Sequence, residues 1–232
     1  MSKVAILIDG GYFLKRLPSV RPDIDASDPK AVVGSIRQLV RNHLSQLNNI
    51  HHATNFYSLL YRCFYYDALP YGNKGQRPVS KRPINFATSE LATFRNGLFD
   101  ALREQSSFAL RLGEVRKPSN NSWILKPSAQ KRLLRGDIDT AGLIDGDFMP
   151  DLHQKGVDMR IGLDIASITL KRQADTIILV SGDSDFVPAA KLARREGVIF
   201  ILDPLWQRVS NDLLEHIDGL RSGFYNPDSR NA

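Results

Sequence analysis

The stretch Thr176–Gly197, TIILVSGDSDFVPAAKLARREG, places two aspartates, Asp183 and Asp185, directly after an apolar run. The run 176–180 is short, continuously apolar and rich in β-branched residues, which is typical of a strand covered on both faces of a parallel sheet. Apolar residues then recur at helical spacing, and Gly197 stands where a C-cap ends a helix. The stretch predicts a strand, a tight turn and a helix. In an open α/β sheet, ligands bind at the carboxyl ends of the strands.

The aspartates also have a simpler explanation, because Asp183, Ser184 or Asp185 can cap the helix by accepting hydrogen bonds from its free N–H groups. A single helix cap accounts for one of these residues and does not explain the second carboxylate. Burying a carboxylate is costly unless a positive group meets it. Both interpretations stay open on this stretch, and the positions of the other acids decide between them.

The rest of the chain alternates strands with helices. Strands are predicted at 3–8, from 54 to about 67, at 108–115 and at 197–203. Helices are predicted from Pro29, around 91–102, within 155–173 and at 210–218. This alternation implies right-handed crossovers and an α/β fold, in which a mainly parallel sheet has helices on both faces.

Acidic residues recur where the predicted strands end. Because parallel strands end at one edge of the sheet, Asp9, Asp67, Asp183 and Asp185 are expected in one neighbourhood, and Asp158, at a helix start, can reach it. Asp164 lies six residues later, about 240° around the helix, so it and Asp158 cannot both face one site squarely.

The expected acidic edge has the chemistry of a site for a hard cation. Crowded carboxylates raise one another's pKa unless a cation neutralises them. Oxygen ligands without clustered cysteine or histidine suit Mg²⁺ or Mn²⁺. The single cysteine, Cys63, excludes an intrachain disulfide and a cysteine-built zinc site. Such an ion can activate water against a phosphodiester, so hydrolysis of nucleic acid is the natural hypothesis.

The charge of the 232-residue chain is unevenly distributed. The formal net charge is +6. Residues 71–136 carry 13 basic and 4 acidic residues, a surplus of +9, which leaves −3 for the remainder. Such segregation fits a polyanion-binding flank beside an acidic metal pocket. The alternative is a basic surface that only aids solubility.

No run of eighteen apolar residues exists, which predicts a soluble, cytoplasmic protein without membrane contact. One domain is expected over 1–225, with a basic insertion at about 116–154 and a tail at 226–232. In the insertion, Trp123 either stacks on single-stranded substrate or packs the insertion onto the domain. The aromatic strand near Cys63 is either core or the interface of a homo-oligomer.

Four segments together carry a likeness to a known family: ILIDGGYF (6–13), KGVDMRIGLDIAS (155–167), TIILVSGDSDFVPAAKLARREGVIF (176–200) and SNDLLEHID (210–218). In this order they resemble the NYN domain, in its LabA-like branch, within the PIN-like nuclease superfamily. The resemblance implies a Rossmann-like three-layer αβα sandwich whose acidic pocket binds Mg²⁺ or Mn²⁺ and cuts RNA.

The resemblance also implies roles for individual residues. Asp9, Asp158, Asp183 and Asp185 would be the catalytic residues and metal ligands, and Ser181 would steady the turn between them. A less direct role would fall to Asp164. Asp67 is a candidate from its place at a predicted strand end, and Tyr12 is a candidate to position a phosphate or stack on a base. Many NYN domains carry Asn shortly after the first aspartate, where this chain has Tyr12 and no amide.

Basic residues are the expected contacts to RNA, whether single-stranded or structured, or to DNA. They are Lys74, Lys81, Arg82, Lys117, Lys126, Lys131, Arg132 and Lys155. A metal-dependent ribonuclease is the first hypothesis. The rivals are an RNA-binding module that has lost turnover and a small-molecule phosphatase or nucleotidase, against which the concentrated basic flank argues.

Overall fold

The computed structural model describes residues 2–116 and 123–227, which form two compact units. The first unit consists of Met1–Asp67, Gly97–Gly113 and Gly156–Ala232, and the second of Ala68–Asn96 and Glu114–Lys155. The expected insertion at 116–154 falls in the second unit. That the whole chain is a single domain with this insertion stays a prediction.

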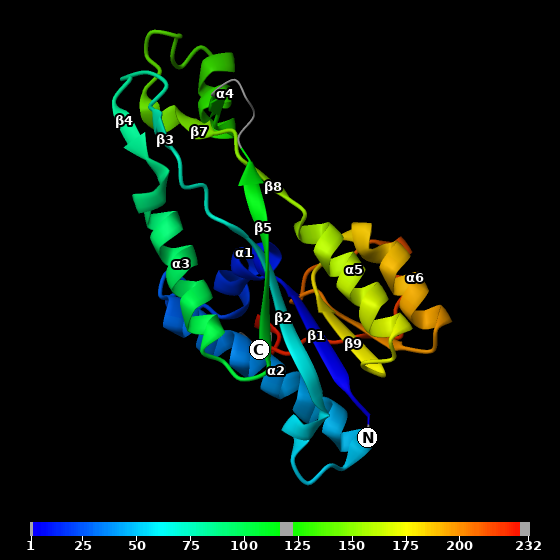
Figure 1. Cartoon of the computed structure of the whole chain (residues 1–232). Coiled ribbons are helices and arrows are strands. Elements are labelled where there is room, and N and C mark those ends of the chain that lie inside the picture. Colours follow the sequence, from blue (N-terminus) through cyan, green and yellow to red (C-terminus); the bar gives the residue numbers. More distant parts are fainter. Residues whose placement is uncertain (1, 117–122, 228–232) are drawn as a thin grey trace. The chain divides into compact units, whose positions relative to one another are not determined.

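A mostly parallel sheet forms the centre of the first unit (Figure 1), with strand order β11-β10-β9-β1-β2-β5. β1 pairs in parallel with both β9 and β2, β9 with β10, and β10 with β11. The strands are β1 (Val4–Asp9), β2 (Leu60–Leu69), β5 (Phe108–Arg116), β9 (Thr176–Val180), β10 (Ile199–Asp203) and β11 (Gly219–Leu220).

Helices cover both faces of this sheet, with α5 and α6 packed together on one face and α1 and α2 on the other (Figure 1). The helices are α1 (Gly10–Val20), α2 (Pro29–His51), α3 (Glu90–Arg103), α5 (Val157–Leu170), α6 (Val187–Arg195) and α7 (Asn211–Leu214), with 3-10 turns η1 (Phe56–Leu59) and η4 (Ser184–Phe186). The predicted three-layer α/β fold is confirmed. Among the residues described, no helix is long and apolar enough to cross a membrane.

The helix boundaries follow local chemistry. Asp28 caps α2 by accepting hydrogen bonds from the N–H groups of Lys30 and Ala31, and Pro29 occupies the first turn. The sequence indicated only a sharp exit after the first strand, but α1 begins there directly at Gly10.

The core consists of the strands and the inward helix faces. Residues Val4–Ile8 of β1 and Ile177–Val180 of β9 are fully buried, and each such aliphatic side chain stabilises the fold by about 1.5–3 kcal/mol. Cys63 is buried in β2, and burial raises the pKa of its thiol well above the usual range.

The second unit contains two small antiparallel sheets. β3 (Lys74–Gln76) pairs with β4 (Pro83–Asn85), and β6 (Trp123–Leu125) with β7 (Phe148–Pro150). Its other elements are η2 (Phe86–Thr88), α4 (Pro127–Leu134), η3 (Asp145–Asp147) and β8 (His153–Lys155), which pairs with the last residues of β5.

Trp123 packs inside the second unit. Its indole Nε1–H donates to the carbonyl of Gln76 at 3.1 Å, and its ring lies 6.1 Å from that of Phe86 between centroids. These contacts favour the packing interpretation of Trp123 over a stacking surface for substrate.

Candidate active site

The carboxyl ends of β1 and β9 lie level with Tyr66 and Asp67 of β2, a strand that continues to Leu69. Ile8 is the register partner of Val180, and Asp9 is the partner of Tyr66. Asp9 therefore stands beside Ser181, which follows Val180, and Asp67 follows Tyr66. The parallel register brings one polar residue from each of three neighbouring strands to a common edge.

Asp9 caps helix α1 and is held at both carboxylate oxygens. Oδ1 accepts a hydrogen bond from the N–H of Tyr12 at 3.0 Å, and Oδ2 accepts one from the hydroxyl of Ser181 at 3.3 Å. Burial raises the pKa of Asp9, the Tyr12 N–H opposes this, and the negative charges of Asp158 and Asp67 raise it further. The Asp9 carboxylate is thus fixed in a place that disfavours its own charge.

Asp183 and Asp185 occupy the turn that leads from β9 into η4. The N–H of Asp183 donates to Ser181 Oγ at 3.3 Å, and Asp183 Oδ1 accepts the N–H of Asp185 at 3.0 Å. Both aspartates are exposed, whereas Ser181 is buried. The capping interpretation therefore holds for Asp183, but it uses only one oxygen of that residue and does not explain Asp185.

Asp158 lies in the first turn of α5, which packs against η4. The pKa of its carboxyl is raised, first by partial burial and then by the negative charges of Asp183 and Asp185. Asp158 in turn raises the pKa of Asp9. The four predicted acids are thus electrostatically coupled, although they come from three separate segments of the chain.

Asp67 and Asp164 differ in their relation to this group. Asp67 is fully buried in β2, and its charge contributes to the raised pKa of Asp9. The Oδ2 atom of Asp164 instead accepts hydrogen bonds from Tyr66 Oη and Arg111 Nε, each at 2.9 Å. Asp164 therefore joins α5 to strands β2 and β5, and its charge is balanced by Arg111.

Tyr12 connects the acidic edge to the turn after β10. Its hydroxyl donates to the carbonyl of Pro204 at 2.6 Å, and burial raises its pKa to about 12. The ring lies against Gly182, where a Cβ atom would stand only 2.9 Å from the hydroxyl oxygen. The hydroxyl proton is already engaged, and a side chain larger than glycine would displace the ring from the turn.

The acid group meets the chemical requirements of a hard divalent cation. No lysine or arginine among the described residues forms an ion pair with Asp9, Asp158, Asp183 or Asp185, so the protein itself leaves their repulsion uncompensated. No three of them within the described part of the chain bring one oxygen each within 4.8 Å of one another. Mg²⁺ usually keeps several waters and takes only one or two carboxylates directly, so a hydrated ion does not require three oxygens at that spacing.

A different trio does meet that spacing. Asp212, Glu215 and His216 each bring one ligand atom within 4.8 Å of the others, at α7 and just beyond it. Asp212 and Glu215 are exposed. Exposed acidic groups of this kind are common without an ion, and no sequence pattern predicted a metal site here.

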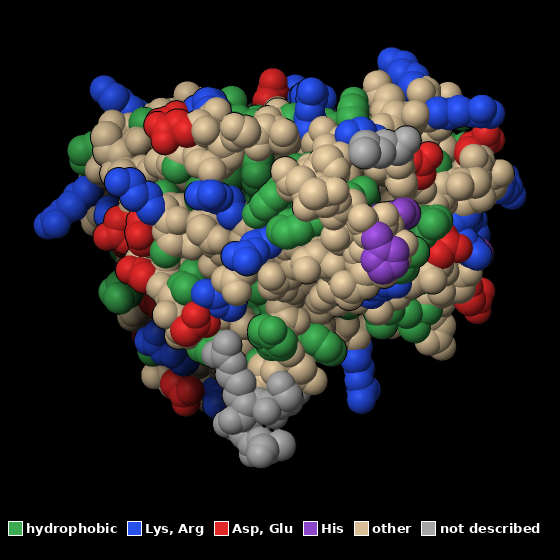
Figure 2. Space-filling view, turned by 90° about the horizontal axis from the view of Figure 1, so that it is seen from below, with side chains coloured by type: hydrophobic (Ala, Val, Ile, Leu, Met, Phe, Trp, Pro, Cys, Tyr) green, Lys and Arg blue, Asp and Glu red, His purple; other side chains and the backbone are tan. Residues whose placement is uncertain are grey.

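The predicted RNA contacts lie in the second unit, which carries twelve basic and seven acidic residues, a net charge of +5. Lys81 Nζ donates to the carbonyl of Pro78, and Arg132 pairs with Asp147 at 3.0 Å. Lys117 lies outside the described residues. The others are exposed and form no ion pair within the described part of the chain: Lys74, Arg82, Lys126, Lys131 and Lys155. On the face of the molecule that Figure 2 shows, lysine and arginine side chains project from the surface, with aspartates and glutamates between them.

Sequence reasoning missed a further acid at the same sheet edge. Asp203 ends β10, is fully buried, and is the register partner of Val180. Its Oδ2 lies 2.8 Å from Nε2 of the buried His43. The sequence contains a signal for Asp203, since it follows an apolar run as Asp9 does. Its histidine partner is 160 residues away, so the pairing itself could not be predicted.

Comparisons with known proteins bear on this site. The family model described as NYN domain matches residues 3–218. No curated protein matches. A crystal structure of a protein of unknown function from Vibrio parahaemolyticus is similar at a TM-score of 0.43 and 16% identity, covering 96% of this chain and 95% of that one.

Proposed function

Because the chain belongs to the NYN domain family of PIN-like nucleases, we propose that it hydrolyses RNA phosphodiester bonds at the acidic edge with Mg²⁺ or Mn²⁺. One observation carries this proposal. The four acids come from three segments of the chain, and the pKa values of Asp9 and Asp158 are raised, first by burial and then by the negative charges of neighbouring acids. None of the four forms an ion pair with a lysine or arginine among the described residues. Clustered, perturbed carboxylates are the mark of a functional site. Membership of the LabA-like branch stays a prediction.

Asp9, Asp158, Asp183 and Asp185 would hold the cation. When bound, a divalent ion neutralises charge on the phosphate and lowers the pKa of a water molecule. The protein's part is orientation: Ser181 fixes Oδ2 of Asp9 and the backbone of Asp183, while capping leaves Asp183 Oδ2 available. Exposed Asp185 and Asp158 complete the negative rim.

The exposed basic residues of the second unit would bind the RNA backbone. Lys74, Lys126 and Lys131 have no ion pair within the described part of the chain, so their charges are available to phosphates. Such contacts are independent of sequence and strongly dependent on salt. We propose single-stranded RNA as the main substrate, with structured RNA or DNA as further substrates.

One observation favours a second candidate, an RNA-binding module without turnover. Tyr12 stands where many NYN domains have asparagine, and its hydroxyl proton is engaged by Pro204. A protein with this substitution could retain the cation and RNA while cleaving slowly or not at all.

The test is incubation of end-labelled single-stranded RNA, matched DNA and mononucleotides with the purified protein in Mg²⁺, Mn²⁺ or EDTA. The Asp9→Asn/Asp183→Asn variant is the control. RNA products that require metal and are absent from the control support the nuclease. Binding without products supports the second candidate, and turnover of mononucleotides alone supports a phosphatase or nucleotidase.

A further inference from the structure

We propose that a pocket beside the acidic edge binds one base of single-stranded RNA next to the cleaved phosphodiester, a role that rests on the proposed nuclease function. The pocket has a volume of about 390 Å³, and six residues supply its walls and charged rim: Trp206, Val209, Leu214, Leu220, Arg208 and Arg221. Small-molecule sites span about 300–1,000 Å³, so the pocket has the size for one nucleotide.

Trp206 is held in an unusual conformation at this pocket. Leu205 and Trp206 have φ angles of 47° and 63°, in the left-handed region that large side chains rarely adopt. The turn is closed by the Gln207 N–H, which donates to the Pro204 carbonyl at 2.9 Å. The indole N–H donates to the carbonyl of Phe224 at 2.9 Å, yet Trp206 stays 46% exposed. Strain of this kind persists where surrounding contacts enforce it, and it concentrates at functional sites.

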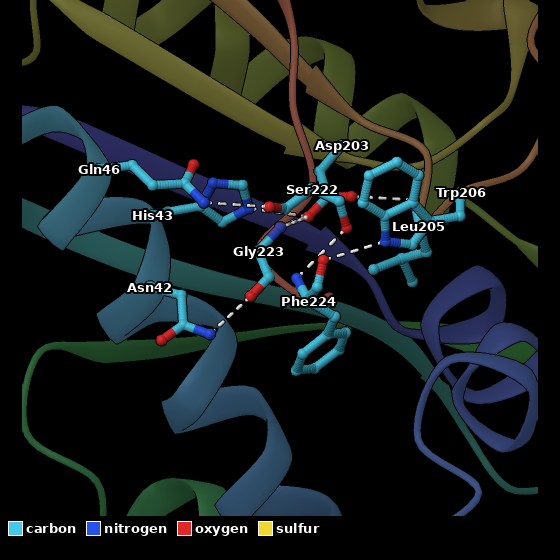
Figure 3. A network of polar contacts seen from close by, with 9 residues as sticks. All are labelled: Asn42, His43, Gln46, Asp203, Leu205, Trp206, Ser222, Gly223 and Phe224. Carbon is cyan, nitrogen blue, oxygen red and sulfur yellow. Dashed lines mark hydrogen bonds and ion pairs between the residues drawn. The ribbon is translucent and has the colours of Figure 1, made fainter. Parts of the chain in front are cut away.

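A single buried carboxylate ties the two walls of the pocket together (Figure 3). Asp203 Oδ1 accepts the N–H of Leu205, which lies between the lining residues Pro204 and Trp206, at 2.8 Å. Oδ2 accepts the N–H of Gly223, which follows the lining residue Ser222, also at 2.8 Å. His43 from α2 meets the same Oδ2 at 2.8 Å, and both side chains of this pair are at most 1% exposed. The relative position of the walls is therefore fixed before any ligand binds.

Helix α2 holds the second wall closely. A Cβ atom at Gly223 would lie 2.7 Å from Leu39 Cδ1 and 2.9 Å from His43 Nε2, so only glycine fits. Asn42 Nδ2 donates to the carbonyl of Gly223 at 2.7 Å, and Gln46 Nε2 to that of Ser222 at 3.2 Å (Figure 3). A preorganised pocket loses little conformational entropy when a ligand enters.

The pocket adjoins the acidic edge through two connections. Tyr12 donates through its backbone N–H to Asp9 and through its hydroxyl to Pro204, where the Trp206 turn begins. Helix α7, which carries Leu214, packs against η4, which carries Asp185. A base in the pocket would thus belong to a nucleotide near the carboxylates.

The chemistry of the lining favours a nucleotide over an apolar side chain of a protein partner. An exposed indole face stacks on any base. Arg208 and Arg221 are exposed and form no ion pair among the described residues, so the rim attracts an anionic ligand. An apolar peptide would leave both arginine charges without a role.

The test measures binding of a fluorescent single-stranded RNA by anisotropy in EDTA, where metal-dependent cleavage is absent. Trp206→Ala is expected to weaken binding by about 5- to 100-fold, the usual loss for a stacked base. Trp206→Phe should retain most of the affinity, and Arg208→Ala/Arg221→Ala should weaken it. Arg195→Ala, which removes an exposed arginine at the last turn of α6, should leave it unchanged. An affinity of Trp206→Ala equal to that of the parent would overturn the proposal.

A second measurement keeps the proposal testable if Trp206→Ala fails to fold. The chain has two tryptophans, so the Trp123→Phe variant reports on Trp206 alone. Its emission should be quenched by the RNA, and less by RNA that lacks one base; unchanged emission would contradict the pocket. Quenching of Trp206 without RNA cleavage in any metal would contradict the proposed nuclease function and support the base-binding pocket. Cleavage without quenching would support the nuclease function and contradict the pocket.

Discussion

The hydroxyl of Ser181 donates a hydrogen bond to Oδ2 of Asp9 across 3.3 Å and so joins the exits of two adjacent strands. The same hydroxyl accepts the N–H of Asp183, also at 3.3 Å. One buried serine therefore sets the positions of two of the four acids that we assign to the metal.

Ser181→Ala should affect catalysis more than folding. Loss of one such hydrogen bond costs about 0.5–1.5 kcal/mol of stability, whereas loss of a group that orients metal ligands typically costs about 10- to 100-fold in activity. Cleavage rate and urea unfolding measure the two effects. Ser35→Ala, at a buried serine of α2, is the matched control and should leave cleavage unchanged. Equal rates for both variants would contradict the role of Ser181.

Two substitutions of Asp183 separate its capping role from its charge. Asparagine can still accept the N–H of Asp185, so Asp183→Asn should match the parent in stability. Asp183→Ala loses the cap and should be less stable by about 0.5–2 kcal/mol. Unfolding in urea measures both, and equal stability of the two variants would show that the cap contributes nothing.

Asp9→Asn should raise the melting temperature in EDTA at pH 7. The folded-state pKa of Asp9 lies above its unfolded value. The fold therefore has its full stability below the unfolded pKa and loses part of it as the pH rises through the folded pKa. Each kcal/mol removed from this penalty should raise the melting temperature by about 2–4 °C.

The controls are the dependence on pH and on metal of the difference in melting temperature between Asp9→Asn and the parent. The gain from Asp9→Asn should shrink toward pH 3, where the parent carboxyl is protonated in both states. Saturating Mg²⁺ should stabilise the parent and not the variant, because a ligand stabilises only the state that binds it. A variant that melts below the parent in EDTA at pH 7 would show that the ionised carboxylate is favoured in the fold.

RNA binding should weaken steeply with salt, and the second unit should account for part of the slope. Each phosphate contact to a single strand contributes about 0.7 to the slope of log K against log salt. Replacing three exposed lysines by alanine should therefore lower the slope by about 2. The three are Lys74, Lys126 and Lys131. Anisotropy titrations at several salt concentrations measure the slope.

The matched control replaces three exposed lysines of the first unit, which have the same charge and a similar exposure. They are Lys30, Lys171 and Lys191. Their replacement should leave the slope nearly unchanged. Equal effects of the two triple variants would assign binding to net charge rather than to the second unit.

Much of the fold followed from local sequence signals. The run 176–180 with Gly197 predicted β9 and α6, and Pro29 predicted the start of α2, because caps and periodicity act within one turn. Helix α1 was missed, since it begins with two glycines and contains Pro18, all poor helix formers. It forms because Asp9 caps it and because Phe13, Leu17 and Val20 bury one face.

The candidate site was predictable where strand exits carry the acids, since parallel topology alone brings Asp9, Asp67 and Asp183 to one edge. Long-range contacts were not. The engagement of Asp164 by Tyr66 and Arg111, and of Asp203 by His43, depends on packing between segments far apart in sequence. Of the short strands of 123–155, β6 pairs with β7 and β8 pairs with β5, and none has a repeating apolar pattern, so their order could not be predicted.

The most direct test of the central claim is the single-turnover rate of RNA cleavage by the parent and by Asp183→Asn, measured as Mn²⁺ is titrated from zero. The two proteins should fold alike, so the comparison isolates one carboxylate charge at the strand exits. If the four aspartates hold the cation, the parent rate should rise with Mn²⁺ to saturation, and the variant should be slower by about 100-fold or more at every concentration. Equal rates for the two proteins, or cleavage by the parent that persists in EDTA, would contradict that claim.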